Sequence, residues 1–342
     1  MTAAVEVRPA GHPAAPVGKI GVLLVNLGTP DAPTPAAVKR YLAEFLIDRR
    51  VVEIPRLVWW PILHGIILQT RPKKSAHAYA QIWTPEGSPL AAITAAQARA
   101  LQTRLGAGVQ VAWAMRYGHP AMGAELQRLK DQGCDRVLIA PLYPQYSGAT
   151  TATVIDAMGA ALAQMRWQPA VRTLPPYHDD ADHIAALKAD VARQLAALTF
   201  VPEVLLLSFH GMPERTLHLG DPYHCQCRKT ARLLAEALAA EWPNLRVETS
   251  FQSRFGRAKW LEPATDAVLV QEAQRGTKRL AIAAPGFSAD CLETREELAI
   301  RGKEQFTSAG GSDFAALDCL NDSEAGMTML EALIRRELAG WL

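Results

Sequence analysis

The segment at 204–211 (VLLLSFHG) constrains the fold more than any other part of the chain. Four apolar residues in a row, bounded by Pro202 and Gly211, predict a short strand that is buried on both faces. Such strands belong to doubly wound α/β sheets, whose ligands bind just beyond the carboxyl ends of the strands. His210 falls at that end. It is either a base placed by the strand or a packed histidine that bonds a backbone carbonyl, and this segment favours the first interpretation only slightly.

The length of 342 residues suits two domains of roughly 150 residues each. With 49% hydrophobic and 20% charged residues, the composition is typical of a globular protein. The net charge of +2 is not gathered in one block, so we expect no nucleic-acid partner. Residues 1–18 are rich in Ala and Pro and predict a disordered tail rather than a signal peptide. The sequence has no apolar run of ~20 residues, so we expect no membrane span.

The chain has an odd number of cysteines and no export signal before them. The five are Cys134, Cys225, Cys227, Cys291 and Cys319. This usage favours reduced thiols in the cytoplasm. The Cys-x-Cys pair at 225–227 has a spacing that suits a metal, but it is too short to indicate one by itself. A structural metal there remains the weaker alternative.

Apolar runs alternate with helix-period stretches along the whole chain, which predicts parallel sheets covered by helices. We expect strands near 20–26, 109–114, 136–141, 171–174, 204–208, 246–250, 279–283 and 314–317. Thr34 followed by Pro35 is typical of a helix start. Asp290 and Glu293 have the spacing of a capping box, in which Glu293 would only support a helix start.

The two halves of the chain resemble each other at matching places. Residues 22–30 parallel 204–213, the Arg-Tyr-Gly at 116–118 parallels the Arg-Phe-Gly at 254–256, and 136–140 parallels 279–283. Together these matches predict two copies of one four-stranded unit with a cleft between them. We therefore expect functional residues at strand ends of both halves, facing each other.

The candidates for chemistry lie at those strand ends. The sequence contains no GxGxxG, P-loop or GxSxG motif, which disfavours dinucleotide, NTP and α/β-hydrolase functions. His210 is a base that works near pH 7, and Glu293 and Glu297, four residues apart, share one helix face. Imidazole and carboxylate are also transient ligands for a divalent first-row metal. This set suits a reaction in which protons leave an apolar ligand as a metal enters.

The apolar segment at 57–68 (LVWWPILHGIIL) is too short to span a bilayer. It is either a buried core helix or an exposed apolar lip over a pocket that meets a greasy ligand or a membrane surface. Arg71, Lys73 and Lys74 follow it directly. Basic groups beside an apolar lip suit an amphipathic ligand with carboxylate ends, or anionic lipid heads.

An ordered set of motifs resembles the ferrochelatases of the bacterial protoporphyrin type, from about residue 19 to about residue 321. The motifs are VNLGTP at 25–30, FLID at 45–48, RYGHP at 116–120, LYPQYS at 142–147, SFHGMP at 208–213, GDPY at 220–223, FQSRFG at 251–256 and DCLET at 290–294. The resemblance implies an α/β fold of two similar Rossmann-like domains, each a four-stranded parallel sheet flanked by helices. It also implies insertion of Fe²⁺ into protoporphyrin IX, which yields protohaem and releases the pyrrole protons.

By the same resemblance, the catalytic residues are His210 and Glu293, and the metal ligands are His210, Glu293 and Glu297. His210 would take pyrrole protons or guide the metal, and Glu297 would continue a metal or proton path. The contacts to the macrocycle or its propionates would be Leu27, Arg71, Arg116, Tyr117, Tyr146 and Ser147. Ferrous iron is then a substrate, and no permanently bound cofactor is expected.

We accordingly expect a tail at 1–18, a first domain at 19–174 with a lip at 46–68, and a second domain at 175–322 that carries His210 and Glu293. A C-terminal helix at 323–342 would pack back on the first domain. We expect a cytoplasmic protein whose lip touches the inner face of the membrane transiently.

Three positions depart from patterns found in the family. Some members bind a [2Fe–2S] cluster through a cysteine where this chain has Gly148, and through three more in a C-terminal extension, so we expect no such cluster here. Cys291 stands where many members have histidine, and Arg301 where a further acid extends the metal path. Alternatives are a coproporphyrin ferrochelatase, another tetrapyrrole chelatase, a non-catalytic porphyrin or haem carrier, and a periplasmic-type binding module, which would need an export signal.

Overall fold

The computed structural model describes residues 10–12, 16–256 and 258–342, and it contains two four-stranded parallel sheets. The first has the order β2-β1-β3-β4 and the second β6-β5-β7-β8. The strands are β1 (Lys19–Thr29), β2 (Val109–Gly118), β3 (Cys134–Pro141), β4 (Ala170–Thr173), β5 (Val204–His210), β6 (Arg246–Gln252), β7 (Arg279–Ala283) and β8 (Asp313–Ala316). The predicted α/β class with two similar parallel sheets is confirmed. We call the part of the chain around the β1–β4 sheet the first lobe and the part around the β5–β8 sheet the second lobe.

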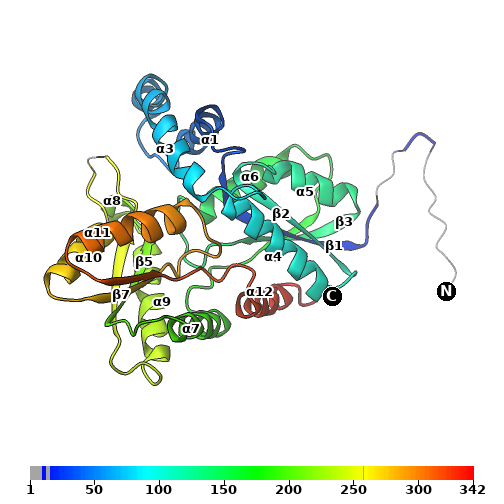
Figure 1. The fold of residues 1–342 in the computed structure, drawn as a ribbon. Helices are drawn as coiled ribbons and strands as arrows, with labels where there is room; N and C mark the ends of the chain where they lie inside the picture. Colours follow the sequence, from blue (N-terminus) through cyan, green and yellow to red (C-terminus); the bar gives the residue numbers. More distant parts are fainter. Residues whose placement is uncertain (1–9, 13–15, 257) are drawn as a thin grey trace.

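Helices connect and cover the strands, and Figure 1 shows the two sheets side by side with α1 and α3 together at one end. The first lobe has α1 (Pro35–Ile47), α2 (Arg56–Ile62), η1 (Leu63–Ile67), α3 (Leu68–Ile82), α4 (Pro89–Leu105), α5 (Met122–Asp131) and α6 (Thr151–Ala163). The rest of the chain has α7 (Ala181–Ala196), α8 (Glu214–His218), α9 (Tyr223–Leu238), α10 (Thr265–Gln274), η2 (Glu293–Gly302), α11 (Lys303–Ser308) and α12 (Glu324–Glu337). The elements η1 and η2 are π-helices.

The central strand of each sheet is buried on both faces, as its unbroken apolar run predicts. The side chains at 22–25 in β1 and 204–207 in β5 are 0% exposed. At the end of β1, Gly28 adopts φ 127°, and a Cβ there would lie 1.9 Å from the carbonyl oxygen of Tyr117 in β2. Only glycine fits this approach of the two strand ends, which is where a ligand would bind.

The described contacts join the two lobes at several points. The C-terminal helix α12 packs against α7 and α4, with ion pairs from Glu331 to Arg104 (3.2 Å) and from Arg336 to Asp180 (2.7 Å). Gln97 of α4 donates hydrogen bonds of 2.9 Å to the backbone carbonyls of Ser288 and Asn321. The domain boundaries stay a prediction. Of the predicted tail, residues 1–9 and 13–15 lie outside the described residues.

The helix start at Thr34 is confirmed, because its side chain accepts a hydrogen bond from the Ala37 amide and Pro35 opens α1. The capping box at Asp290 and Glu293 is wrong. The amide of Asp290 bonds the side chain of Asn321 (2.8 Å), and the Asp290 carboxylate accepts from Thr294 (2.8 Å). The carboxylate of Glu293 is therefore not the partner of the Asp290 amide.

Among the described residues, no helix is long and apolar enough to cross a bilayer.

We expect acid to destabilise the fold through His183 of α7. This side chain is 1% exposed and lies edge-on to the ring of Tyr177, and burial lowers its pKa from 6.5 to about 4. Below pH 6.5 His183 is protonated in the unfolded chain but stays neutral in the folded chain. The free energy of unfolding therefore falls as the pH drops towards 4. Between pH 7 and pH 5 this group alone should remove about 2 kcal/mol of unfolding free energy.

Urea unfolding of the parent chain and of His183→Gln at both pH values measures this effect. The variant should lose about 2 kcal/mol less than the parent on acidification, whatever its stability at pH 7. Equal losses in the two proteins would contradict the assignment.

Candidate active site

A cavity lies between the lobes, at the carboxyl ends of β1, β3, β5 and β7. Its empty volume is about 790 Å³ when the open solvent at its mouth is counted. Its lining is mainly apolar and aromatic and comprises Asn26, Leu27, Gly28, Thr29, Tyr41, Tyr79, Ser88, Leu90, Leu142, Tyr143, Gln145, Thr150, His210, Tyr223, Gly286, Phe287, Ser288, Ala289, Cys291, Leu292 and Glu293. Strand ends of both lobes contribute, as the duplication predicts, but His210 and Glu293 both come from the second lobe.

His210 is the last residue of β5, and its ring is oriented by the backbone. Its Nδ1 lies 2.6 Å from the carbonyl oxygen of Gly211. Because a carbonyl only accepts, Nδ1 carries the proton and Nε2 is left as the basic nitrogen of the neutral ring. The Gly211 amide donates to the Gln252 carbonyl (2.7 Å), and a Cβ at Gly211 would lie 2.5 Å from that oxygen. The absence of a side chain at Gly211 thus allows the end of β5 to approach β6 closely.

Glu293 opens the π-helix η2 and lines the cavity beside Cys291. Two buried tyrosines of the first lobe, Tyr41 and Tyr79, line the same region. Their pKa values lie well above the usual range, first because of burial and further because of the nearby Glu293 carboxylate. The two tyrosines therefore remain neutral hydroxyls. They line the same cavity as the Glu293 carboxylate and give that region weakly polar groups.

Glu297 lies one turn further along η2, behind the cavity lining. Its carboxylate accepts two hydrogen bonds from Ser253, from the amide (2.8 Å) and from the hydroxyl (2.6 Å). Arg301 approaches it at 3.7 Å. Burial raises the pKa of Glu297, while Ser253 and Arg301 act in the opposite direction. The charges of Glu293 and His210 both influence this pKa, so the three groups lie near one another.

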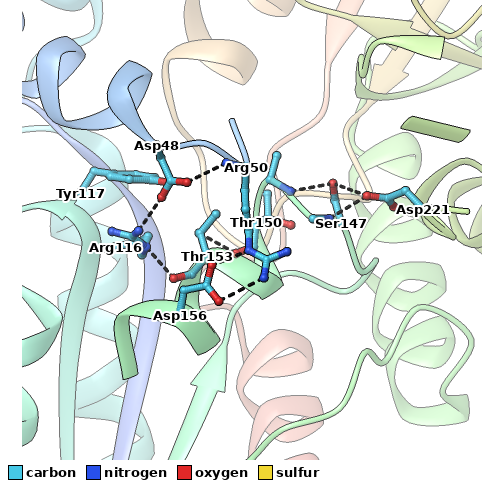
Figure 2. Close-up of polar contacts among 11 residues, drawn as sticks. Asp48, Arg50, Arg116, Tyr117, Ser147, Thr150, Thr153, Asp156 and Asp221 are labelled. Carbon is cyan, nitrogen blue, oxygen red and sulfur yellow. Dashed lines mark hydrogen bonds and ion pairs between the residues drawn. The ribbon is translucent and has the colours of Figure 1, made fainter. Parts of the chain in front are cut away.

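Arg116 and Tyr117 lie at the end of β2 and do not line the cavity. Figure 2 shows that both bond Asp48, which accepts from Arg116 at 2.6 Å and from the Tyr117 hydroxyl at 2.9 Å. Arg116 also donates to the carbonyl of Thr153 (2.7 Å) and stacks over the Tyr117 ring. Its charge influences the pKa of Tyr143, a residue that does line the cavity. Arg116 and Tyr117 therefore lie close behind the wall.

Tyr146 and Ser147 also lie outside the lining. The Tyr146 amide donates to the side chain of Gln226 (2.6 Å), and the Ser147 hydroxyl donates to Asp221 (3.2 Å; Figure 2). The Gly148 amide donates to the same carboxylate (2.7 Å), and a Cβ at Gly148 would lie 3.3 Å from it. Asp221 thus ties the first lobe to the start of α9. The expected absence of a cluster at Gly148 stays a prediction.

Leu27 and Arg71 complete the expected contacts. Leu27 lines the cavity. Arg71 of α3 lies over the ring of Phe255 in the second lobe, 5.3 Å from its centroid, and burial lowers the pKa of its guanidinium. Of the expected site residues, the cavity therefore brings together Leu27, His210 and Glu293, whereas Glu297, Arg71, Arg116, Tyr117, Tyr146 and Ser147 are not part of its lining.

Sequence reasoning assigned no role to Asp48, Asp221 and Ser253. Asp48 bonds Arg116 and Tyr117, Asp221 bonds Ser147, and Ser253 bonds Glu297. Each lies in one of the motifs quoted above, FLID, GDPY and FQSRFG. Membership of these motifs was therefore the one sequence signal for the three residues. The residues that they bond are distant in sequence, so spacing could not identify them.

Solved structures share this fold. The sirohydrochlorin chelatase SirB from Bacillus subtilis subspecies spizizenii in complex with cobalt matches with a TM-score of 0.55 at 10% identity, over 95% of this chain and 98% of that one. SirB from Bacillus subtilis with Fe³⁺ matches with a TM-score of 0.54 at 12% identity, over 95% and 97%. At such identities the likeness concerns the fold alone. The two sheets therefore have the fold of these chelatase structures.

Sequence comparison is more specific. The model of the ferrochelatase family matches residues 19–338. A ferrochelatase of Rhizobium meliloti (strain 1021) is 52% identical over 335 residues, which are 97% of this chain and 98% of that one. A ferrochelatase of Polaromonas sp. (strain JS666 / ATCC BAA-500) is 53% identical over 334 residues, 97% and 90% of the two chains. The chain belongs to the ferrochelatase family, as its motifs indicate.

Proposed function

We propose that this protein inserts Fe²⁺ into protoporphyrin IX to form protohaem. The observation that carries the proposal is the meeting of His210 and Glu293 on the wall of one cavity between the lobes, in a chain of this family. A porphyrin carrier needs the cavity but has no use for a base and a carboxylate within it.

The geometry suggests a role for each group. Nε2 of His210 is free to accept a pyrrole proton or to guide the metal, because Nδ1–H is held by the Gly211 carbonyl. Glu293 receives or offsets the protons, and Glu297 lies behind it as a second carboxylate on the metal or proton path. The apolar walls bind the macrocycle, and that binding energy can hold a bent form whose pyrrole lone pairs face the ion.

The remaining expected residues act at the edges of the cavity. Leu27 contacts the macrocycle directly, and Arg71 lies near the apolar lip, where it can meet propionates. Arg116, Tyr117, Tyr146 and Ser147 support the wall through Asp48, Gln226 and Asp221.

An anaerobic assay with Fe²⁺ and either protoporphyrin or coproporphyrin tests the proposal. The absorbance bands of the free base should disappear with protoporphyrin, and faster turnover of coproporphyrin would replace the substrate. Turnover of neither macrocycle would reject a metal chelatase function.

The lip is exposed, so the alternative of a buried core helix is wrong for most of it. The side chains of Leu57, Val58, Trp60 and Ile66 are 93%, 55%, 56% and 57% exposed, although Leu63 and Leu68 are buried. Arg56, Lys73 and Lys74 are exposed nearby. An apolar patch edged by cations suits the surface of an anionic membrane. We propose that a cytoplasmic protein with reduced thiols touches the membrane there transiently.

Replacing Leu57 and Trp60 together by Glu should reduce binding to vesicles containing anionic lipid at least tenfold, since each side chain otherwise buries apolar area worth ~1.5–3 kcal/mol. Co-sedimentation measures the bound fraction. Val201→Glu combined with Leu342→Glu is the matched control, because both side chains are 63% exposed but lie outside the lip. Equal losses in the two proteins would show that added charge, and not the lip, is responsible.

A further inference from the structure

The end of β6 contacts each part of the acid–base machinery. Gln252 and Ser253, which we call the β6 clamp, lie next to both β5 and η2. The side-chain amide of Gln252 donates to the carbonyl of Glu293 (3.1 Å), and its backbone carbonyl accepts from Gly211, the residue after His210 (2.7 Å). Ser253 donates to both oxygens of Glu297 (2.8 and 2.6 Å). Two adjacent residues thus bond the backbone next to His210, the backbone of Glu293 and the carboxylate of Glu297.

The backbone at Ser253 is strained in a way that serves these contacts. Ser253 has φ 66°, a left-handed conformation that residues other than Gly rarely adopt. This conformation turns the Ser253 amide and hydroxyl towards the same carboxylate. Gln252 is 2% exposed, and its Oε1 accepts a hydrogen bond from the hydroxyl of Ser208 (2.6 Å). Its side chain is therefore also held by β5.

We propose that Gln252 and Ser253 are positioning residues for metal insertion, which hold Glu297 and the start of η2 in register with His210. This inference depends on the proposed function. Each oxygen of a carboxylate has two lone pairs, and Ser253 occupies one on each oxygen of Glu297. The clamp thereby fixes where the remaining lone pairs point, and these are the ones that can receive an ion or a proton.

Ser253→Ala should lower kcat/KM for Fe²⁺ about tenfold or more, the usual effect of losing one hydrogen bond to a charged group. The KM for porphyrin should stay unchanged, because the hydroxyl bonds Glu297 and not the cavity. The variant keeps the Cβ and the amide bond, so the backbone contact to Glu297 remains.

A double-mutant cycle assigns the effect to Glu297. In a Glu297→Gln background, Ser253→Ala should reduce kcat/KM for Fe²⁺ by less than threefold further. The matched control is Asp266→Asn, which breaks the ion pair that Arg254 of the same loop makes with α10 (2.7 Å) and should leave the kinetics unchanged. The full effect in the Glu297→Gln background, or a porphyrin KM that rises with the loss, would overturn the proposal.

Amide hydrogen exchange tests the clamp without any turnover. Gln252→Met keeps the side-chain length but cannot donate to the Glu293 carbonyl, so residues 293–302 should exchange faster while β1 is unchanged. Unchanged exchange in 293–302 would reject the role of Gln252. A parent chain that inserts no iron would reject the proposed function instead, and the exchange result would still decide whether the clamp holds η2.

Discussion

Replacement of His210 by Asn should abolish iron insertion and leave porphyrin binding intact. The amide nitrogen of Asn can still donate to the Gly211 carbonyl, as Nδ1 of His210 does. The variant therefore keeps the local backbone but lacks the basic nitrogen that faces the cavity. We expect kcat to fall by a factor of about 10²–10⁴, the range for removal of a general base. His210→Ala, which loses the hydrogen bond as well, should be impaired at least as much.

Two measurements separate this outcome from a structural defect. Fluorescence quenching gives the porphyrin dissociation constant, and urea unfolding gives the stability of each variant. His218→Ala is the control, because the His218 side chain is 71% exposed on α8. If His210→Asn inserts iron at near the parent rate, the base is a different group and His210 is a packed histidine.

Glu293→Gln is the second substitution with a large expected effect. It keeps the shape of the side chain beside Tyr41, Tyr79 and Cys291. It removes the charge that, in the proposed function, receives or offsets the protons. We expect kcat to fall by roughly 10²–10³, with a porphyrin KM within twofold of the parent. A loss confined to kcat indicates a group that acts in the reaction rather than in binding.

The control for Glu293 is Glu304→Gln. Glu304 is an exposed acid on α11, the helix that directly follows η2, and its charge faces solvent. Assays over a range of Fe²⁺ concentrations show whether excess metal restores the rate. Activity of Glu293→Gln above a third of the parent value would exclude a proton or metal role for this carboxylate.

The strands were the most predictable part of the fold. Every expected strand overlaps an observed one, and the interval 279–283 agrees at both ends. An apolar run between turn residues specifies such a strand locally, through burial on two faces. The duplication then predicted that strand ends of both halves would face one cavity. The helix around Glu293 was less predictable: the spacing of Asp290 and Glu293 suggested a capping box, whereas Asn321 takes the Asp290 amide and the helix is of the π type.

The sequence by itself predicted the two sheets, because each strand depends on a pattern within a few residues. The ordered set of motifs along the chain indicated the family, and that resemblance singled out His210 and Glu293. Only the tertiary structure decided what holds the surrounding side chains. Arg116 bonds Asp48, 68 positions away, and Ser253 bonds Glu297, 44 positions away. Parallel strands need long crossover connections, so residues that meet at the sheet edge are far apart in the chain. Their pairing depends on how the lobes pack, which no local pattern encodes.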